Sequence, residues 1–346
     1  MSALKEIVPP LLDWYGRNAR SLPWRDQPEP YRVWVSEIML QQTRVEAVKP
    51  YFARFMEELP AVAALAAAPE QQLMKLWEGL GYYSRARNLQ KAAQVLVEQY
   101  GGELPANYEE LLRLPGIGPY TAGAVASIAF QIPAPAVDGN VLRVVMRLAA
   151  SRDNISEPAV KRAVEEQVRE IIPQDRPGDF NQAMMELGAT VCGPGGEPRC
   201  LVCPLAALCE GNRLGIAREL PVKAKKKARR IEEKTVFLLV HSGELAIRRR
   251  EDSGLLAGLW ELPSAEGRLS PEGAGEVLQD WGIRPLALKP LPAAKHIFTH
   301  VEWHMTGYWV NLEEKPDGFA WAGRNELLEV YALPSAFRAY LDAFTG

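Results

Sequence analysis

The 346-residue sequence has no long apolar run and no recognisable export signal. Its most apolar stretch, LPAVAALAAAP at residues 59–69, is interrupted by prolines and is shorter than the roughly 20 residues that a membrane-spanning helix needs. Residues 1–20 contain acidic side chains and lack the apolar segment and small-residue cleavage site of a signal peptide. We therefore expect a cytoplasmic protein with no membrane partner.

The sequence also lacks the strong positive charge of many nucleic-acid-binding proteins, because its formal net charge is -3. The charge is unevenly spread: residues 1–230 have a small excess of Lys and Arg, and residues 231–346 have an excess of Asp and Glu. A phosphate-binding surface would therefore be a local patch, which we expect in the N-terminal part. The length and the 47% hydrophobic content are typical of a folded protein with two domains.

Cysteine is scarce, and all four cysteines fall within CGPGGEPRCLVCPLAALC at residues 192–209. A disulfide framework is not expected in a cytoplasmic chain of this size. Four thiolates could instead hold a structural zinc ion or supply one ligand to each iron of a [4Fe-4S] cluster. A single CxxC, joined by a longer loop to one further cysteine on each side, favours an iron–sulfur cluster, while zinc remains the alternative. The predicted ligands are Cys192, Cys200, Cys203 and Cys209.

The apolar pattern changes along the chain and indicates two kinds of structure. From Val8 to about Ile172 the spacing is helical, with short breaks at Gly, Pro and Asn. PVKAKKKARRI at residues 221–231 is typical of an exposed basic linker. Beyond it the pattern predicts an α+β domain. Its expected strands are 234–240, 244–250 and 304–312, and its expected helices are 271–283 and 335–344.

Glu37 lies in PYRVWVSEIMLQQTRV, which predicts a helix beginning at Pro30 or Tyr31. Its neighbours one turn away include Val33, Trp34 and Leu40, so the carboxyl group would lie beside apolar side chains. Such surroundings raise a carboxyl pKa and allow it to hold a proton near neutrality. The alternative is a partly exposed helix glutamate with no role in chemistry.

Asp138 precedes a predicted helix that continues to Leu148, and its simplest role is that of the helix N-cap. A carboxylate held by helix N-terminal amides also stays ionised, as a group facing a developing positive charge must. A third stretch, LPGIGPYTAGAV at residues 114–125, places Pro and Gly between two apolar segments and predicts a sharp turn between helices. By itself this turn could be only a connector.

Taken together, the segments LPGIGPYTAGAV, VDGNVLRV, SEIMLQQTRV and GLGYYSRARNL and the cysteine set resemble those of the helix-hairpin-helix, iron–sulfur DNA glycosylases. Within that family the chain is similar to the adenine DNA glycosylases, which remove adenine mispaired with 8-oxoguanine. The resemblance implies that Glu37 protonates adenine N7, that Asp138 stabilises the oxocarbenium-like sugar and that Asn140 supports the site. Endonuclease III-like members have a Schiff-base lysine where this chain has Tyr120, which implies a monofunctional glycosylase that uses water as the final nucleophile.

The resemblance also implies how the chain would grip DNA. The glycines of the turn, Gly116 and Gly118, would let backbone amides reach a DNA phosphate beside a bound monovalent cation. Other residues are implied to contact the duplex around 8-oxoguanine, with Gln42 and Tyr82 as wedges and Thr43 and Leu80 beside them.

The family's motif for reading 8-oxoguanine in the C-terminal domain is Phe-Ser-His. In this chain it is Phe298-Thr299-His300, which keeps the hydroxyl and adds a methyl group. A second departure is the spacing between Cys192 and Cys200, where GPGGEPR is one residue longer than is usual. A loop rich in glycine absorbs that residue easily, so the cluster assignment stands.

The implied architecture is multidomain. An all-α helix-hairpin-helix glycosylase domain would span 1–221 and include the [4Fe-4S] loop 192–209, followed by a basic linker at 222–231 and an α+β Nudix-like 8-oxoguanine recognition domain at 232–346. The expected partner is double-stranded DNA with an A:8-oxoguanine or A:G mispair, bound by a monomer at the nucleoid.

Three alternatives compete with this interpretation. The first is an endonuclease III-like glycosylase and lyase, and the second is a non-catalytic DNA-binding iron–sulfur protein. The third is Nudix pyrophosphate hydrolysis, which needs an arginine and several glutamates on one helix to hold magnesium. Gly275 and Gln279 occupy positions where the arginine and one such glutamate are expected, which favours a recognition module instead.

Overall fold

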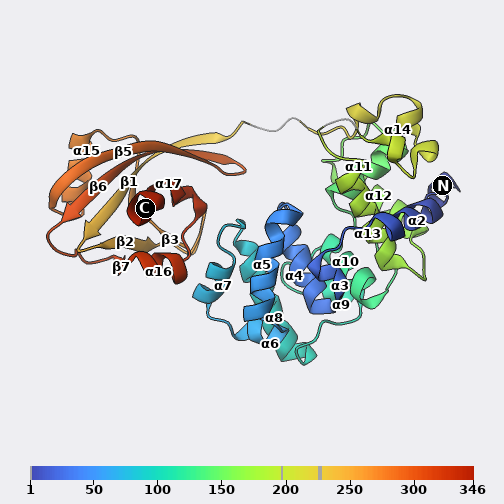
Figure 1. The fold of residues 1–346 in the computed structure, drawn as a ribbon, viewed down its shortest axis with the longest axis horizontal. Coiled ribbons are helices and arrows are strands. Elements are labelled where there is room, and N and C mark those ends of the chain that lie inside the picture. The colour runs from blue at the N-terminus through green and yellow to red at the C-terminus, as the bar shows by residue number, and fades with distance from the viewer. Residues whose placement is uncertain (1, 196–197, 225–227) are drawn as a thin grey trace. The chain divides into compact units, whose positions relative to one another are not determined.

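The computed structural model describes residues 2–195, 198–224 and 228–346 (Figure 1). It divides into two compact units: the first comprises Met1–Ala67 and Arg87–Lys225, and the second comprises Ala68–Ala86 and Lys226–Gly346. Residues 225–227 of the predicted linker and residues 196–197 of the cysteine loop lie outside the described residues.

The described part of the first unit is helical, as the spacing of apolar residues predicts. Proline opens several of its helices, because its fixed φ and missing N–H suit the first helical turn. Its helices and 3-10 turns are α1 (Ser2–Lys5), α2 (Val8–Asn18), α3 (Pro23–Asp26), α4 (Pro30–Leu40), α5 (Val45–Glu58), α6 (Val62–Ala67), α8 (Ser84–Tyr100, whose first turn belongs to the second unit), α9 (Tyr108–Leu112), α10 (Pro119–Phe130), α11 (Gly139–Leu148), α12 (Pro158–Ile171), α13 (Pro177–Thr190), η1 (Cys200–Val202), η2 (Ala206–Leu208), α14 (Glu210–Arg213) and η3 (Ala217–Glu219).

The packing of α10, α11 and α13 positions the site described below. A Cβ at Gly123 of α10 would lie 1.9 Å from the backbone oxygen of Pro135, so only glycine lets this loop cross the helix so closely. Asn181 of α13 fixes the same loop from the other side, because its buried side chain accepts from Ala136 N (3.2 Å) and donates to Ala134 O (2.8 Å). The loop then leads directly into Asp138.

The second unit is a mixed seven-stranded sheet with helices, as predicted for an α+β domain. The strands run in the order β3-β2-β1-β6-β5, β4 pairs with β1, and β7 pairs with β2. The elements of this unit are α7 (Glu70–Leu76), β1 (Arg230–His241), β2 (Glu244–Arg249), β3 (Trp260–Glu261), β4 (Ser264–Glu266), α15 (Pro271–Asp280), β5 (Pro285–Ile297), β6 (Val301–Leu312), β7 (Ala320–Ala322), α16 (Arg324–Glu329), η4 (Ser335–Phe337) and α17 (Arg338–Thr345).

Alternate residues of β1 face opposite sides of the sheet, which is the period of a strand. Val236 and Leu238 pack with Phe337 and Tyr340 on the face covered by η4 and α17. Phe237 packs on the other face with Leu278 of α15. The sheet therefore lies between two helical layers. In the described residues, no helix is both long enough and apolar enough to cross a membrane.

The sequence does not predict β5, because Pro285, Pro290 and Pro292 argue against a strand. The structure shows why they are tolerated: β5 lies at the edge of the sheet and, among the described strands, pairs with β6 alone, with register shifts between Pro285 and Ala287 and between Leu291 and Ala294. An edge strand leaves half of its N–H groups unpaired, so a missing N–H costs little there. The turn from β5 to β6 contains residues 298–300.

Candidate active site

A cavity of about 160 Å³ in the first unit gathers the two carboxylates singled out from the sequence. Glu37 and Asp138 both line it, as do Tyr120 and Asn140. The helix around Glu37 begins at Pro30, as predicted, and Asp138 caps α11, as predicted. Two local patterns about a hundred residues apart in sequence therefore contribute to one cavity.

Glu37 is buried, with 6% of its surface exposed. The hydroxyl of Tyr120 donates a hydrogen bond to its Oε2. Burial raises the pKa of Glu37 to about 7, while the Tyr120 hydrogen bond lowers it and the charge of Asp138 raises it. Near neutral pH this carboxyl group can therefore hold a proton and release it, which is the requirement for a general acid.

Asp138 accepts hydrogen bonds on both carboxylate oxygens. Its Oδ1 accepts from the backbone N–H groups of Asn140 (2.9 Å) and Val141 (2.8 Å), and its Oδ2 accepts from the Asn140 side-chain amide (2.6 Å). Burial raises the pKa of Asp138, and these hydrogen bonds oppose the increase. The three donors all favour the ionised form, so the geometry fits a fixed negative charge facing the cavity.

Asn140 is itself held by two residues. Its Oδ1 accepts from Arg143 Nη2 (2.8 Å), and the same nitrogen donates to Gly188 O (2.7 Å). A Cβ on Gly188 would lie 2.6 Å from the Asn140 Cβ, so α13 can approach α11 this closely only with glycine. Gly188 therefore sets the position of the amide that bonds to Asp138.

Tyr120 is half-buried on α10, and the loss of solvent around its hydroxyl together with the neighbouring carboxylates raises its pKa well above its usual value. The phenol thus stays neutral and donates to Glu37. Its oxygen also contacts Met185 Sδ at 3.7 Å. A phenol cannot form a Schiff base, so this position does not supply the amine that a lyase needs.

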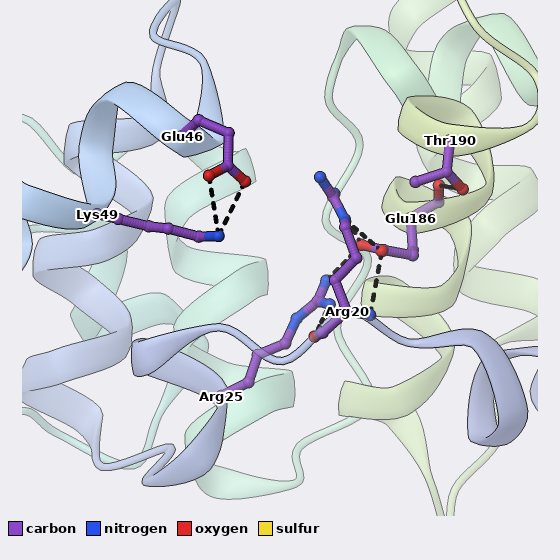
Figure 2. A network of polar contacts seen from close by, with 6 residues as sticks. All are labelled: Arg20, Arg25, Glu46, Lys49, Glu186 and Thr190. Atoms are coloured by element: carbon purple, nitrogen blue, oxygen red, sulfur yellow. Dashed lines mark hydrogen bonds and ion pairs between the residues drawn. The ribbon is translucent and has the colours of Figure 1, made fainter.

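An arginine pair that sequence reasoning missed forms another wall of the cavity (Figure 2). Arg20 donates to Glu186 through Nε (2.5 Å) and Nη2 (3.0 Å), and Arg25 Nη2 donates to Glu186 Oε2 (2.9 Å). Burial opposes the ionisation of Glu186, but these hydrogen bonds and charges lower its pKa overall. No local pattern singled out Glu186, because its neighbours one turn away include Gln182 and Thr190 in place of the large apolar side chains that flank Glu37.

The cysteine loop lies against the core of the first unit, where Cys192, Cys203 and Cys209 pack. Arg147 donates to Cys192 Sγ at 3.2 Å. Burial, together with the charges of the other three cysteines, raises the pKa of Cys203 to about 11, so the four sulfurs lie within electrostatic reach of one another.

Burial also raises the pKa of Cys209, and backbone hydrogen bonds from Leu205 and Asn212 oppose the increases at Cys203 and Cys209. Across the described residues, no three His, Cys, Asp or Glu side chains are already close enough together to hold a metal ion. The donors nevertheless fit a soft metal centre, because all four are thiols and both a guanidinium and backbone groups stabilise their charged forms.

The predicted turn lies between α9 and α10. Gly116 has φ +75°, and a Cβ there would lie 2.6 Å from the Asn88 Cβ, so conformation and space both require glycine. A Cβ on Gly118, the residue before Pro119 of α10, would meet nothing within 4 Å. Gly118 is exposed, so the backbone that leads into α10 faces open space.

The structure distributes the predicted duplex-contact residues between the units. Gln42 and Thr43 follow α4 in the first unit, and Gln42 has φ +60°. Leu80 and Tyr82 belong to the second unit, where Tyr82 has φ +48°.

Within the second unit the Tyr82 hydroxyl lies 2.6 Å from Thr299 Oγ1. On either side of Thr299, Phe298 packs edge-on against Trp303 and the backbone oxygen of His300 accepts from Arg230 N (3.1 Å). Two hydroxyl groups that the sequence separates widely are thus adjacent.

Comparisons with known proteins agree with this geometry. The family model for HhH-GPD superfamily base excision DNA repair proteins matches residues 35–170, and the model for the NUDIX domain matches residues 235–343. The chain is 35% identical to the adenine DNA glycosylase of Mus musculus, covering 97% of this chain and 78% of that one. It is 36% identical to the adenine DNA glycosylase of Homo sapiens, covering 95% and 73%.

Two solved structures resemble the helical part. One is a thermostable thymine-DNA glycosylase, with a TM-score of 0.56 and 29% identity over 62% of this chain and 98% of that one. The other is a trapped endonuclease III–DNA covalent intermediate, with a TM-score of 0.52 and 30% identity over 61% and 98%. The likeness thus covers the unit that holds the two carboxylates.

Proposed function

This chain belongs to the adenine DNA glycosylase family, and from that premise we propose that it excises adenine opposite 8-oxoguanine or guanine by acid-catalysed hydrolysis of the N-glycosidic bond. One observation carries the proposal. Glu37, whose pKa is raised to about 7, shares a cavity with Asp138, whose carboxylate is held by three hydrogen-bond donors. This is the two-carboxylate arrangement that glycoside cleavage uses.

In the proposed mechanism the adenine leaves the base stack and enters the cavity. Glu37 gives its proton to adenine N7, which makes the base a better leaving group. The N-glycosidic bond then breaks with its electron pair going to adenine N9, and the fixed charge of Asp138 stabilises the oxocarbenium-like sugar. Water attacks the anomeric carbon, and the ionised Glu37 accepts its proton, which restores the starting protonation state.

Tyr120 and Asn140 keep the two carboxylates in these roles. Tyr120 donates to Glu37 and orients it, and Asn140 donates to Asp138 and favours its ionised form. The Arg20–Arg25–Glu186 network gives the cavity a polar wall of fixed charges next to apolar Leu22 and Met185. Such a wall can hydrogen-bond the edge of a flipped base while the apolar residues contact its faces.

We propose that the DNA backbone is held by amides of Gly116 and Gly118 next to a monovalent cation, and that Gln42, Thr43, Leu80 and Tyr82 contact the duplex around the base opposite adenine. Relatives of the helical part were solved with bound DNA, which supports a double-stranded DNA partner. Since its substrate is chromosomal DNA, we place the protein at the nucleoid in the cytoplasm, acting as a monomer.

We further propose that residues 1–221 perform the chemistry, that 222–231 link the domains and that 232–346 read 8-oxoguanine through Phe298, Thr299 and His300. The four cysteines of loop 192–209 would hold a [4Fe-4S] cluster with one thiolate on each iron. Bound there, the cluster would brace the loop against the core that also carries α11 and α13.

The test is excision from a labelled duplex by purified protein. We expect adenine release from A:8-oxoguanine, slower release from A:G and none from G:8-oxoguanine, with A:C as a further control. The product strand should remain intact until it is treated with alkali, because Tyr120 cannot act as a lyase amine. Strand cleavage without alkali and efficient borohydride trapping would favour the endonuclease III-like alternative. DNA binding without release of any base would favour a non-catalytic role.

A further inference from the structure

Residues 68–86 precede most of the catalytic residues in sequence, yet they fold with residues 226–346 in the second unit. They comprise α7, the turn that carries Tyr82 and the first residues of α8. Two charged side chains on and just after α7 bind this segment to the second unit, beside the exposed contacts of Glu70 with Arg249 and of Gln71 with Val330 O.

Lys75 binds the end of α16. Its Nζ donates to the backbone oxygens of Leu327 (3.2 Å) and Tyr331 (3.0 Å), and its side chain is only 18% exposed. Carbonyl groups at the C-terminal end of a helix lack helical partners and carry partial negative charge, so an ammonium group suits them.

Glu78 binds Leu333, just beyond the residues that Lys75 binds. Its Oε1 accepts from the backbone N–H of Leu333 (2.8 Å), and its Oε2 pairs with Lys75 Nζ (2.7 Å). We call Lys75, Glu78 and the backbone groups of residues 327–333 that they bind the clasp. The charged groups are partly buried, satisfied by backbone partners and paired with each other, so replacing either one leaves polar groups without partners.

The turn after Glu78 is stiff enough to pass a displacement on to Tyr82. The indole N–H of Trp77, a fully buried residue, donates to Gly81 O (3.1 Å), and Arg85 Nη2 donates to Leu80 O and to Gly81 O (both 3.2 Å). The Arg85 guanidinium also lies over the rings of Trp77 and Tyr82. The turn therefore moves as one piece with the end of α7.

At the far end of this piece, the Tyr82 hydroxyl lies 2.6 Å from Thr299 Oγ1. This contact is exposed, and one exposed hydrogen bond is too weak to fix a tyrosine by itself. The Thr299 loop has its own anchor, because Arg229 Nε donates to Phe298 O (3.1 Å). The position of Tyr82 relative to Thr299 thus depends on the clasp.

We propose that Lys75 and Glu78 are positioning residues that fasten the Tyr82 turn to the C-terminal sheet and its helices, so that Tyr82 and Thr299 meet the base opposite adenine as one surface. This rests on the proposed function, in which both residues contact that base. Neither clasp residue lines the cavity of Glu37, and the proposed function assigns neither of them to the DNA contact. The clasp therefore controls discrimination between 8-oxoguanine and guanine rather than the chemistry of excision.

The experiment compares Lys75→Met and Glu78→Gln with the full-length protein, using single-turnover excision from A:8-oxoguanine and A:G duplexes. We expect the ratio of the A:8-oxoguanine rate to the A:G rate to fall about tenfold in Lys75→Met and by a smaller factor in Glu78→Gln. The A:G rate itself should change by less than about twofold. Lys75→Arg keeps the charge and the donors and should restore most of the ratio. Arg169→Met, which breaks an exposed pair with Glu166 on α12, is the matched control and should leave the ratio unchanged.

Two further measurements separate positioning from a general structural role. Hydrogen exchange of the backbone amides at 77–83 should become faster in Lys75→Met than in the unmodified protein. The unfolding temperature of the first unit should be the same in both proteins. Adding Thr299→Ala to Lys75→Met should lower the ratio little beyond Thr299→Ala alone, because both changes disrupt one arrangement.

The outcomes are distinct. If the unmodified protein shows no preference for A:8-oxoguanine, the proposed function fails. If it shows the preference and both clasp variants keep it, the clasp has no role in discrimination. Equal losses of excision rate on both duplexes would also overturn the proposal. So would fully additive effects of Lys75→Met and Thr299→Ala on the ratio of the two rates.

Discussion

Tyr120 donates its phenolic hydrogen to Glu37 Oε2. This bond joins α10, the helix that follows the glycine-rich turn, to α4, the helix that carries the carboxyl group with the raised pKa. The segment proposed to grip the DNA backbone and the proposed acid therefore share a direct contact. In the proposed function, the same pair of helices therefore sets the positions of the DNA phosphate and of the proton donor.

The first prediction concerns the two carboxylates. Glu37→Gln has no proton to give at the required pKa, and Asp138→Asn removes the fixed negative charge, so each should reduce adenine excision by about a thousandfold or more. Binding of a duplex with a non-cleavable adenine analogue should stay within about threefold of the unmodified protein, since neither change touches the DNA backbone. Single-turnover excision and a binding titration measure the two effects. Retained excision in both variants would remove the basis for the mechanism.

The second prediction is the pH dependence and its sign. The proposed mechanism needs Glu37 protonated and Asp138 ionised. The rate should therefore fall as the pH rises above about 7, the raised pKa of Glu37, and fall again at acidic pH as Asp138 takes up a proton. Tyr120→Phe removes a hydrogen bond that lowers the pKa of Glu37, so the alkaline limb should move to higher pH. Rate profiles of the two proteins measure the shift, and an alkaline limb that moved to lower pH would contradict the assignment.

The third prediction concerns the cysteines. Protein purified without oxygen should be brown, absorb broadly near 400 nm and contain about four irons per chain if four thiolates hold one cluster. Cys203→Ser should lower the iron content, because hydroxyl is a poor ligand for this centre. Stoichiometric zinc without iron, after expression with ample iron, would establish the zinc alternative instead.

Local patterns were enough to predict much of the site but not its walls. The helix from Pro30 and the cap at Asp138 depend on neighbours within one turn, so the sequence predicts both. The ion pairs of Glu186 with Arg20 and Arg25 join residues more than 160 positions apart, and no periodicity encodes such a pairing. The same holds for residues 68–86, whose place in the second unit depends on Lys75 and Glu78 meeting backbone groups about 250 residues away.

The fourth prediction concerns one of these long-range contacts. Gly188→Ala would place a Cβ 2.6 Å from the Asn140 Cβ and 3.1 Å from its Cα, so α11 must move away from α13. The Asn140 amide then shifts from Asp138 Oδ2, and the excision rate should fall at least about tenfold with little change in duplex affinity. Gly16→Ala on α2, where a Cβ meets nothing within 4 Å, is the matched control and should keep full activity. An unchanged rate in Gly188→Ala would mean that Asn140 is not held in place by this contact.

The last prediction concerns the threonine in place of the family's serine. 8-Oxoguanine differs from guanine in its N7–H and its C8 oxygen, so a reader must offer an acceptor to N7–H. Thr299 Oγ1 keeps that acceptor, and the adjacent Tyr82 hydroxyl supplies a second polar group within 2.6 Å. One hydrogen bond to a desolvated base edge contributes roughly 1–3 kcal/mol to discrimination. Thr299→Ala should therefore lower the preference for A:8-oxoguanine over A:G by about tenfold, whereas Thr299→Ser, which removes only the methyl group, should preserve or increase it.

Paired single-turnover rates on the two duplexes measure the preference, and the unfolding temperature controls for loss of folding. If Thr299→Ala keeps the full preference, the lesion is read by other residues, with Gln42 and Tyr82 the next to be replaced.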